Sequence, residues 1–364
     1  MHLPFDTTFA LLAAAPVPAN FWLPEAASTL AGETDFMFDL INWICYVFFA
    51  LVTALLVGFA WKYRQKGTAR TGFTAGPTHH TPLEVTWTII PLIIVIVVFF
   101  MGFKGFLNFA TPPRDTYDID VTAAKWLWTF KYPNGATSDD LYIPSERPVR
   151  LVMRSEDVLH SLFIPQFRIK RDVVPGRYNQ VWFQSDNPTG EDLEAAYDLF
   201  CTEYCGTGHS NMNRKVYVLE QTAFDEWVTE QGQWLDAIPD EELYFKAGPK
   251  LFARCANCHS LDGSPNTGPT WQGLWDRARN GTTEFTDGTR LADLIGPGKE
   301  FETPEDYLRD SIYNPGKHLV KPYTNAMPTF KGQLNDRMVE ALIGMMKNVD
   351  QFDAKGNWKN APAQ

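Results

Sequence analysis

One short segment in the middle of the chain carries the strongest chemical signal. It reads Cys201-Thr-Glu-Tyr-Cys205-Gly-Thr-Gly-His209-Ser-Asn-Met212, and His160 lies well upstream of it. Two thiolates, two imidazoles and a thioether are soft ligands that select copper or another thiophilic metal over magnesium or calcium. A mononuclear blue-copper site needs only one Cys, two His and a weak axial Met. Because a second Cys follows four residues after the first, one loop can present both thiolates to two metal ions.

Two other interpretations of this segment are a Cys201–Cys205 disulfide and a zinc site. Tight cysteine pairs with His nearby are more typical of metal or haem attachment than of a disulfide framework. Structural zinc sites use Cys and His ligands without a thioether. The His-x-x-Met ending and the distant His160 therefore favour copper. Cys45, the fifth cysteine, lies in an apolar run, and we expect an inert thiol that is buried or faces lipid.

A second motif, Cys255-Ala-Asn-Cys258-His259, has the spacing of a c-type haem attachment site. In such a site two thiols form thioethers with the haem vinyl groups and the His becomes an axial iron ligand. Met327 is our choice for the opposite axial ligand, because it lies in a Pro-punctuated loop, Ala-Met-Pro-Thr-Phe, that can reach the iron. The later methionines have helical spacing, which is typical of core residues; they are Met338, Met345 and Met346.

Two further features have simple structural interpretations. Residues 125–132, Lys-Trp-Leu-Trp-Thr-Phe-Lys-Tyr, alternate aromatic and other side chains, and such a strand is most often packing. Residues 82–88 place Glu84 at the start of an apolar run, where an acid is ordinarily solvated at the membrane interface. Neither feature predicts a function on its own.

Two uncharged runs are long enough to cross a membrane. Residues 40–61 form a run of 22 and residues 85–103 a run of 19, and about 20 apolar residues span the hydrocarbon core as a helix. The loop between them is basic and has no acid before Glu84, so the positive-inside rule places it in the cytoplasm and both termini outside. Its cations are Lys62, Arg64, Lys66 and Arg70. The first 20 residues are apolar but lack the basic start of a good signal peptide.

The remainder of the chain divides into a β-rich part and a helical part. Val149, Leu151 and Met153 alternate with Arg150, Val152 and Arg154, and Val216 and Val218 flank a tyrosine. With Gly and Pro turns between such segments, this pattern predicts a β-sandwich or barrel of roughly 100 residues. A helix over residues 222–235 and a break near Pro239 lead into a segment, residues 241–349, that is rich in helical patterns.

Taken together, the motifs resemble cytochrome c oxidase subunit II of the haem-copper oxidase family, here with a fused C-terminal cytochrome c domain. The resemblance covers nearly the whole chain. It implies a transmembrane two-helix hairpin, a cupredoxin-like β-barrel and an all-α class I cytochrome c domain. The expected parts are a leading segment, signal or periplasmic, over residues 1–35, the hairpin over 36–110, the copper domain over 111–238 and the cytochrome domain over 239–364.

By this resemblance six residues hold the binuclear copper centre CuA: His160, Cys201, Glu203, Cys205, His209 and Met212. The two cysteines bridge both coppers, and His160 and Met212 complete one of them. His209 and the backbone carbonyl of Glu203 complete the other. The carboxylate of Glu203 reaches a magnesium ion shared with subunit I.

The resemblance also implies roles for the two features that have none on their own. Trp126 resembles the tryptophan at which electrons enter from cytochrome c, although Ala124-Lys125 precedes it where many family members have a His-Gln pair. Glu84 matches the glutamate at the mouth of a proton pathway into subunit I. The haem carried by Cys255, Cys258, His259 and Met327 would pass electrons to CuA and on to the haem of subunit I, where oxygen is reduced to water and protons are pumped.

The implied partners are subunit I and the other oxidase subunits, a cytochrome c or respiratory-complex donor, and membrane lipid. The implied location is the bacterial inner membrane, with both cofactor domains on the periplasmic side. The chain has 364 residues and a formal net charge of −11, which argues against a nucleic-acid partner and favours a cationic one.

Three other protein classes share part of this pattern. A nitrous-oxide-reductase-like enzyme would need a large propeller and no hairpin. A copper-delivery protein with a thioredoxin-like fold has Cys-x-x-x-Cys and a remote His, but Met212 and the two membrane helices disfavour it. A quinol-oxidase subunit II shares the fold and lacks the copper ligands, so the cysteines and histidines present here exclude it.

Overall fold

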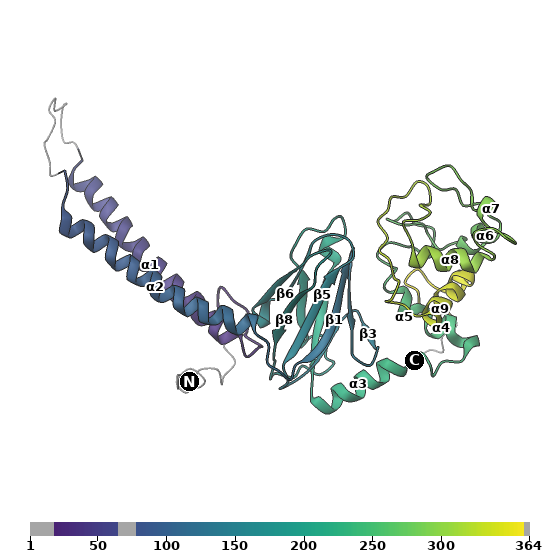
Figure 1. Ribbon diagram of the computed structural model, residues 1–364, viewed down its shortest axis with the longest axis horizontal. Coiled ribbons are helices and arrows are strands. Elements are labelled where there is room, and N and C mark those ends of the chain that lie inside the picture. The colour runs from purple at the N-terminus through teal and green to yellow at the C-terminus, as the bar shows by residue number, and fades with distance from the viewer. Residues whose placement is uncertain (1–17, 65–77, 360–364) are drawn as a thin grey trace, which may run out of the picture. The chain divides into compact units, whose positions relative to one another are not determined.

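The computed structural model describes residues 18–64 and 78–359 (Figure 1). These residues form two compact units. The first comprises the chain up to Arg114 together with Gln166–Arg168, and the second comprises Asp115–Pro165 and the chain from Ile169 onward. The first 17 residues, about half of the expected leading segment, lie outside the described residues, as do Lys66 and Arg70 of the basic loop.

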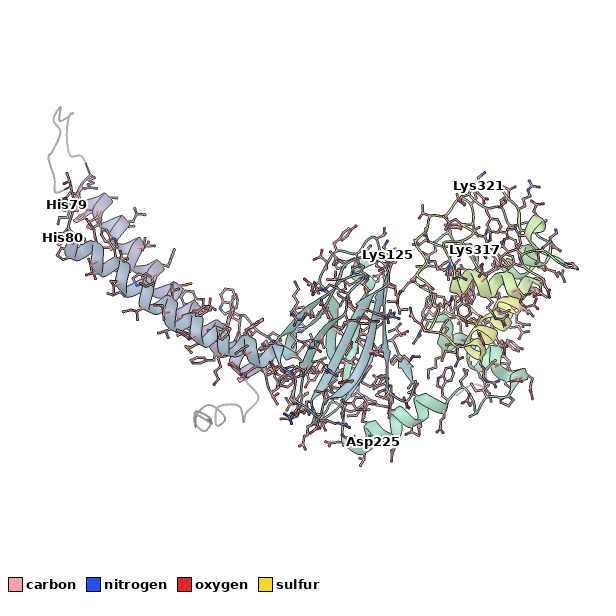
Figure 2. The ribbon with its side chains drawn as sticks, in the orientation of Figure 1. His79, His80, Lys125, Asp225, Lys317 and Lys321 are labelled. Atoms are coloured by element: carbon pink, nitrogen blue, oxygen red, sulfur yellow. The ribbon has the colours of Figure 1, made fainter. Side chains whose placement is uncertain are left out.

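The first unit is built on two long helices, α1 (Ala31–Lys62) and α2 (Thr81–Ala110), which lie side by side (Figure 1). Both are apolar and long enough to cross a membrane, and their 32 and 30 residues extend beyond the two uncharged runs at either end. The α2 helix begins after His79 and His80 (Figure 2). The Nδ1 atom of His80 accepts the Leu83 N–H at 3.2 Å, and Glu84 accepts the His80 N–H at 2.8 Å, so this helix start is capped from both directions.

A buried ion pair fixes the N-terminal end of α1. The guanidinium of Arg168 donates to Asp35 at 2.7 Å, and the two side chains are only 5% and 7% exposed. Arg168 also donates to the Pro24 carbonyl, and the Gln166 carbonyl accepts the Ala27 N–H at 2.8 Å. Residues 166–168, which lie more than 100 positions later in the sequence, therefore hold the segment before α1 in place.

The second unit starts with a β-sandwich of two five-stranded sheets, ordered β3-β2-β1-β5-β8 and β4-β10-β9-β6-β7. The first sheet contains β1 (Tyr117–Ala124), β2 (Leu127–Lys131), β3 (Thr137–Ser138), β5 (Val149–Ser155) and β8 (Asn179–Phe183). The second contains β4 (Leu141–Pro144), β6 (His160–Ile164), β7 (Ile169–Val173), β9 (Tyr197–Cys201) and β10 (Arg214–Leu219). The β1–β5 and β4–β10 pairs are parallel, and the other pairs are antiparallel.

The alternation seen in the sequence gives the inner faces of these sheets. Val149, Leu151 and Met153 of β5 are fully buried, as are Val216 and Val218 of β10. Because side chains of a strand point to opposite faces in turn, one face of each strand can fill the space between the sheets. The expectation of a β-sandwich or barrel is confirmed.

A helical part follows the sandwich. It comprises α3 (Gln221–Gln233), α4 (Leu243–Lys246), α5 (Gly248–Phe252), α6 (Leu274–Arg279), α7 (Leu291–Leu294), α8 (Pro304–Tyr313) and α9 (Asp336–Lys347), with one-turn 3₁₀ segments at Asp240–Glu242 and Val349–Gln351. Among its described residues β-structure is limited to isolated bridges, in agreement with the expected all-α domain. The break near Pro239 falls between α3 and α4.

The core of the helical domain forms around α9. Val339, Leu342 and Met345 are buried, and α4, α5 and α8 pack against this helix. The ends of the helices follow from local chemistry: Thr303 and Asp306 form a capping box at α8, and the Asn335 side chain accepts the Met338 N–H at α9. Met345 and Met346 are core residues as expected, and Met338 is partly buried against them.

Candidate metal centre and C-terminal cavity

The six residues expected to bind copper come together at one end of the sandwich. His160 opens β6 and Cys201 closes β9, and these strands are paired through Leu162 and Cys201. The loop after β9 turns back at Cys205 into a 3₁₀ turn, His209–Asn211, and Met212 follows. Strand pairing therefore unites residues that are distant in the sequence, and a short loop adds the others.

The sulfur atoms of the two cysteines are the centre of this cluster. Cys201 Sγ lies 3.8 Å from His160 Nδ1 and 3.4 Å from the Glu203 carbonyl oxygen. Cys205 Sγ lies 3.4 Å from His209 Nδ1 and 3.9 Å from Met212 Sδ. Each of the other four expected ligand atoms is thus within 4 Å of a thiol sulfur. The groups about each sulfur, His160 with the Glu203 carbonyl and His209 with Met212, differ from the ligand pairs that the resemblance implies for each copper.

The positions of the sulfur atoms also distinguish between a disulfide, a zinc site and a copper site in this loop. The two thiol sulfurs are 3.9 Å apart, almost twice the length of a disulfide bond, and both cysteines are free. A thioether within the cluster fits copper better than zinc. His160, Cys201, Cys205 and Met212 are buried, so water is excluded from most of the donor set.

Asp157 orients the deepest histidine. Its Oδ1 lies 2.9 Å from His160 Nε2, which fixes a proton on Nε2 and turns Nδ1 toward Cys201, as outer hydrogen bonds do for metal-ligating histidines. Burial raises the pKa of Asp157, but hydrogen bonds from His160 and from the Val158 and Lys125 N–H groups outweigh it and leave that pKa lowered. Sequence reasoning did not identify Asp157; an acid three residues before a ligand histidine was the available signal.

The two thiols have opposite pKa shifts. Burial raises the pKa of Cys201, but hydrogen bonds from His160 and from backbone N–H groups outweigh it and lower that pKa overall. Burial and then the negative charge of Cys201 raise the pKa of Cys205. The second proton is therefore hard to remove until positive charge enters the site, so metal binding is coupled to proton release.

Trp126 covers the copper loop. The side chain is 6% exposed, and its Nε1–H donates to the Cys205 carbonyl at 3.2 Å. The indole packs so closely that a Cβ on Gly208 would lie 2.4 Å from its Cδ2 atom, and one on Gly206 would lie 3.2 Å from Cζ2. The sequence did not single out these glycines, although their alternation in Cys-Gly-Thr-Gly-His was visible. Trp126 also lines the cavity of the helical domain.

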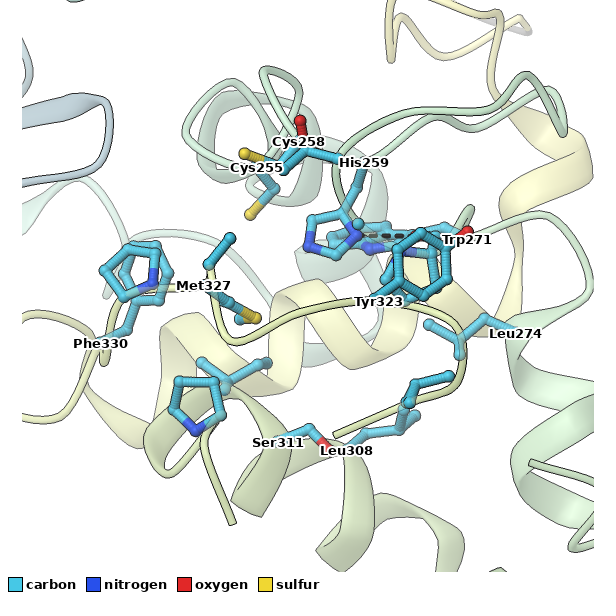
Figure 3. Close-up of a pocket in the computed structure, with 18 of the residues that line it drawn as sticks. Cys255, Cys258, His259, Trp271, Leu274, Leu308, Ser311, Tyr323, Met327 and Phe330 are labelled. Atoms are coloured by element: carbon cyan, nitrogen blue, oxygen red, sulfur yellow. Dashed lines mark hydrogen bonds between the residues drawn. The ribbon is translucent and has the colours of Figure 1, made fainter. Parts of the chain in front are cut away.

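The helical domain contains a large cavity, with an empty volume of about 1410 Å³ that includes space open to solvent. Cys255, Cys258, His259 and Met327 all line it (Figure 3). The remaining wall is mostly apolar, with Trp271, Leu274, Leu308 and Phe330 among its residues. Both cysteines are free, and burial raises the pKa of both thiols, that of Cys255 to about 12.

His259 is held in a ligand-like orientation. Its Nδ1–H donates to the Pro269 carbonyl at 2.7 Å, the dashed line in Figure 3, so Nε2 carries the free lone pair. Burial lowers the pKa of this imidazole, and the hydrogen bond raises it in part. Gly268 lies so close that a Cβ there would be 2.7 Å from His259 Cε1. The Gly-Pro dipeptide therefore sets the position of the ring.

Three side chains considered in the sequence analysis lie outside both the metal cluster and the cavity. Among the described residues, the hydrogen bonds of Glu84 lie within the start of α2, and the Glu203 side chain is exposed. Cys45 is exposed on α1, which fits the lipid-facing alternative. Their suggested roles depend on other subunits or on lipid.

A two-helix membrane anchor joined to a two-sheet sandwich with a buried Cys, His and Met loop defines a membrane-anchored cupredoxin-like metalloprotein. Two family models match this chain: cytochrome c oxidase subunit II, transmembrane domain, over residues 16–104, and its periplasmic domain over residues 135–219. The chain is therefore similar to cytochrome c oxidase subunit II in both its membrane part and its β-sandwich part. Both matches end before the helical domain, which has the all-α form of a cytochrome c-like domain.

Parts of this chain are similar to individual proteins. Cytochrome c oxidase subunit 2 of Alkalihalophilus pseudofirmus is 32% identical over 209 residues, which are 54% of this chain and 59% of the relative. The subunit 2 of Bacillus sp. PS3 is 27% identical over 71% of this chain and 72% of the relative. A solved periplasmic domain of subunit II from Bradyrhizobium japonicum is 25% identical and covers 34% of this chain and 99% of that domain, with a TM-score of 0.31.

Proposed function

We propose that the chain is the electron-relay subunit of a proton-pumping terminal cytochrome c oxidase. Electrons from an external donor would pass through covalent haem c in the helical domain to CuA in the sandwich, and then to the haem of subunit I. The observation that carries the proposal is the copper site, in which four donor groups lie within 4 Å of one of two thiol sulfurs that are themselves 3.9 Å apart. The chain itself supplies no oxygen chemistry.

The residues of the loop fit a binuclear copper centre. Cys201 and Cys205 are close enough to share two ions between their thiolates, and His160 and His209 approach from opposite cysteines. Met212 and the Glu203 carbonyl supply the weak ligands. The bound pair would supply one-electron transfer, while the buried protein frame and the Asp157 hydrogen bond hold the ligands in place.

The residues of the cavity fit a covalent haem. Addition of each thiol S–H across a haem vinyl double bond would form a thioether without any other reactant. His259 Nε2 and the Met327 thioether are the proposed axial ligands, a combination that raises the haem potential. The apolar wall would exclude water from the iron, and this also favours a high potential.

The remaining roles extend the proposal to other subunits. Trp126 would accept electrons on their way to CuA, since its indole contacts the Cys205 carbonyl and also lines the haem cavity. Glu203, with an exposed carboxylate, would share magnesium with subunit I, and Glu84 would open a proton pathway. Lys62 and Arg64 at the end of α1 support a cytoplasmic loop, with both cofactor domains on the periplasmic side of a bacterial inner membrane.

Metal and haem content of the full chain test this proposal. The chain, purified in detergent after expression with haem-attachment machinery and loaded with copper, should hold two coppers and one covalent haem. Cys205→Ser should lose copper and keep haem, whereas Cys258→Ala should weaken haem attachment and keep copper. Cys45→Ser is the matched control and should change neither. A single copper, or none under conditions that retain haem, would favour a copper-handling protein instead.

A further inference from the structure

The haem cavity contains polar groups that the proposed attachment does not use. His318 Nδ1 and Thr283 Oγ1 are both buried, and within the described part of the chain neither has a hydrogen-bond partner. Both residues line the cavity, and Thr283 is only 6% exposed. Buried polar atoms without partners are rare in native proteins. Two of them in the wall of one apolar cavity indicate a polar part of the ligand.

The attachment chemistry tells which part of a haem would meet them. Thioethers at Cys255 and Cys258 hold the edge that bears the vinyl groups, and the two carboxylates of a haem lie on the opposite edge. In Figure 3 the cysteines lie across the cavity from Leu308 and Ser311 of α8. Tyr307 of the same helix packs on Phe285 and Phe301, with ring centroids 6.0 and 5.7 Å apart.

The two unpartnered groups belong to that far side. The His318 ring lies between the same two phenylalanines, 5.2 Å from Phe285 and 5.7 Å from Phe301. Thr283 lies near the Tyr307 hydroxyl but not in hydrogen-bonding geometry. Burial raises the pKa of this phenol, and the nearby Ser311 and Thr283 side chains lower it in part. The carboxylate edge of a haem and the unpartnered donors are therefore on the same side of the cavity.

The outer nitrogen of His318 fixes its protonation. Nε2 lies 2.8 Å from Glu300 Oε1, and a carboxylate accepts there, so Nε2 carries a proton. A neutral imidazole would then present a lone pair at Nδ1, which cannot bind a carboxylate. An imidazolium donates from both nitrogens, so a haem carboxylate at Nδ1 requires the charged form.

We propose that His318, as an imidazolium, and Thr283 donate hydrogen bonds to the haem carboxylates, and that the potential of the haem follows the charge of His318. The inference deepens the proposed function and rests on its covalent haem. When His318 loses its proton, a haem carboxylate loses its neutralising partner, and the oxidised haem, which has one more positive charge, becomes relatively more stable. The potential should therefore fall as pH rises.

Other charged groups lie near His318 and affect how the haem potential depends on pH. Lys317 binds Glu300 at 2.7 Å and lies 3.6 Å from Asp310 (Lys317 is labelled in Figure 2). Asp287 faces His318 from the neighbouring segment, and its pKa is lowered first by the Thr289 N–H and partly by His318. Arg277 also lines the cavity, but its guanidinium donates to the Gln272 and Thr270 carbonyls. Of these groups, His318 is the one with a buried nitrogen that has no hydrogen-bond partner among the described residues.

The test is a redox titration of the covalent haem in the full chain in detergent, from about pH 5 to pH 9, the range in which histidines change charge. The wild-type potential should fall through part of this range. His318→Phe keeps an aromatic ring beside Phe285 and Phe301. Its haem potential should not change with pH and should stay at the value that wild type reaches at high pH. At low pH its equilibrium constant for reduction by a fixed mediator should therefore be lower than that of wild type by roughly threefold or more. His318→Gln should remove the pH dependence in the same way.

Further variants separate the proposal from a general disturbance of the fold. Thr283→Val should lower the whole curve but keep its slope, Thr283→Ser should match wild type, and exposed His79→Gln is the matched control. If the potentials of both His318 variants follow the wild-type curve, the proposal is wrong. It is also wrong if these variants lose the low-spin iron spectrum, because His318 would then be an iron ligand. If haem attaches and only the pH response is missing, the proposed relay stands and this inference fails. If no haem attaches to wild type, both fail.

Discussion

Replacing Gly208 with alanine should dislodge Trp126 from the copper loop. A Cβ at position 208 would lie 2.4, 2.7 and 2.8 Å from three atoms of the indole. Ordinary contact begins near 3.4 Å, so the ring or the loop must move by about 1 Å. The Trp126 hydrogen bond to the Cys205 carbonyl, 3.2 Å long, would break with it.

The expected cost follows from this overlap. Overpacking a well-filled site costs about 1–3 kcal/mol, and a lost hydrogen bond adds about 1 kcal/mol. For a unit of this size each kcal/mol lowers the melting temperature by about 2–4 °C. Gly208→Ala should therefore melt roughly 4–16 °C below wild type and accept electrons from reduced cytochrome c more slowly.

Calorimetry of the copper-loaded full chain measures the first effect, and stopped-flow reduction measures the second. Gly58→Ala is the matched control, because a Cβ at position 58 of α1 meets nothing within 4 Å. If Gly208→Ala melts within about 1 °C of wild type and is reduced at the same rate, the packing of Trp126 against the loop described above is wrong.

Three further predictions concern single contacts. Asp157→Asn should lose about 1.5–3 kcal/mol, because a charged acceptor of the His160 proton is removed, and should shift the copper absorption bands. The lowered pKa of Asp157 means that its contribution exists above the unfolded pKa near 4 and disappears as pH falls through the lower folded pKa; acid unfolding of wild type and Asp157→Asn should converge below about pH 3. Gly268→Ala, with its Cβ 2.7 Å from His259, should yield chains with a displaced axial ligand, visible in the haem spectrum. Asp35→Asn should lower the unfolding free energy of the membrane unit by about 3–5 kcal/mol, because it removes one charge of a buried ion pair; unchanged denaturant resistance would contradict this.

The spacing of the copper loop was enough to predict the cluster, because strand pairing and a short loop leave few ways to arrange Cys201, Cys205 and His209. His160 was a candidate ligand from its residue type, but its place on one copper came from the family resemblance, since nothing local shows that β6 lies beside β9. Asp157, Gly206 and Gly208 were missed because their importance depends on where the Trp126 indole and the His160 ring lie. That information exists only in the folded domain.

Hydropathy located the membrane helices but not their ends. The α1 helix begins at Ala31, well before the uncharged run. Its first turns carry Glu33 and Asp35, which shorten the uncharged run, and the helix tolerates Asp35 because Arg168 neutralises it. A charged side chain ends a hydrophobic run without ending a helix. Likewise, His318 and Thr283 could not be identified from sequence, since each is an ordinary residue until the cavity brings them together.

Electron paramagnetic resonance of the oxidised, copper-loaded full chain tests the central claim most directly. The relay proposal predicts a signal in which one unpaired electron couples equally to two copper nuclei, and this signal should disappear in Cys205→Ser. A signal from a single copper nucleus in the wild-type chain, or a spectrum unchanged by Cys205→Ser, would contradict a binuclear centre bridged by these two cysteines.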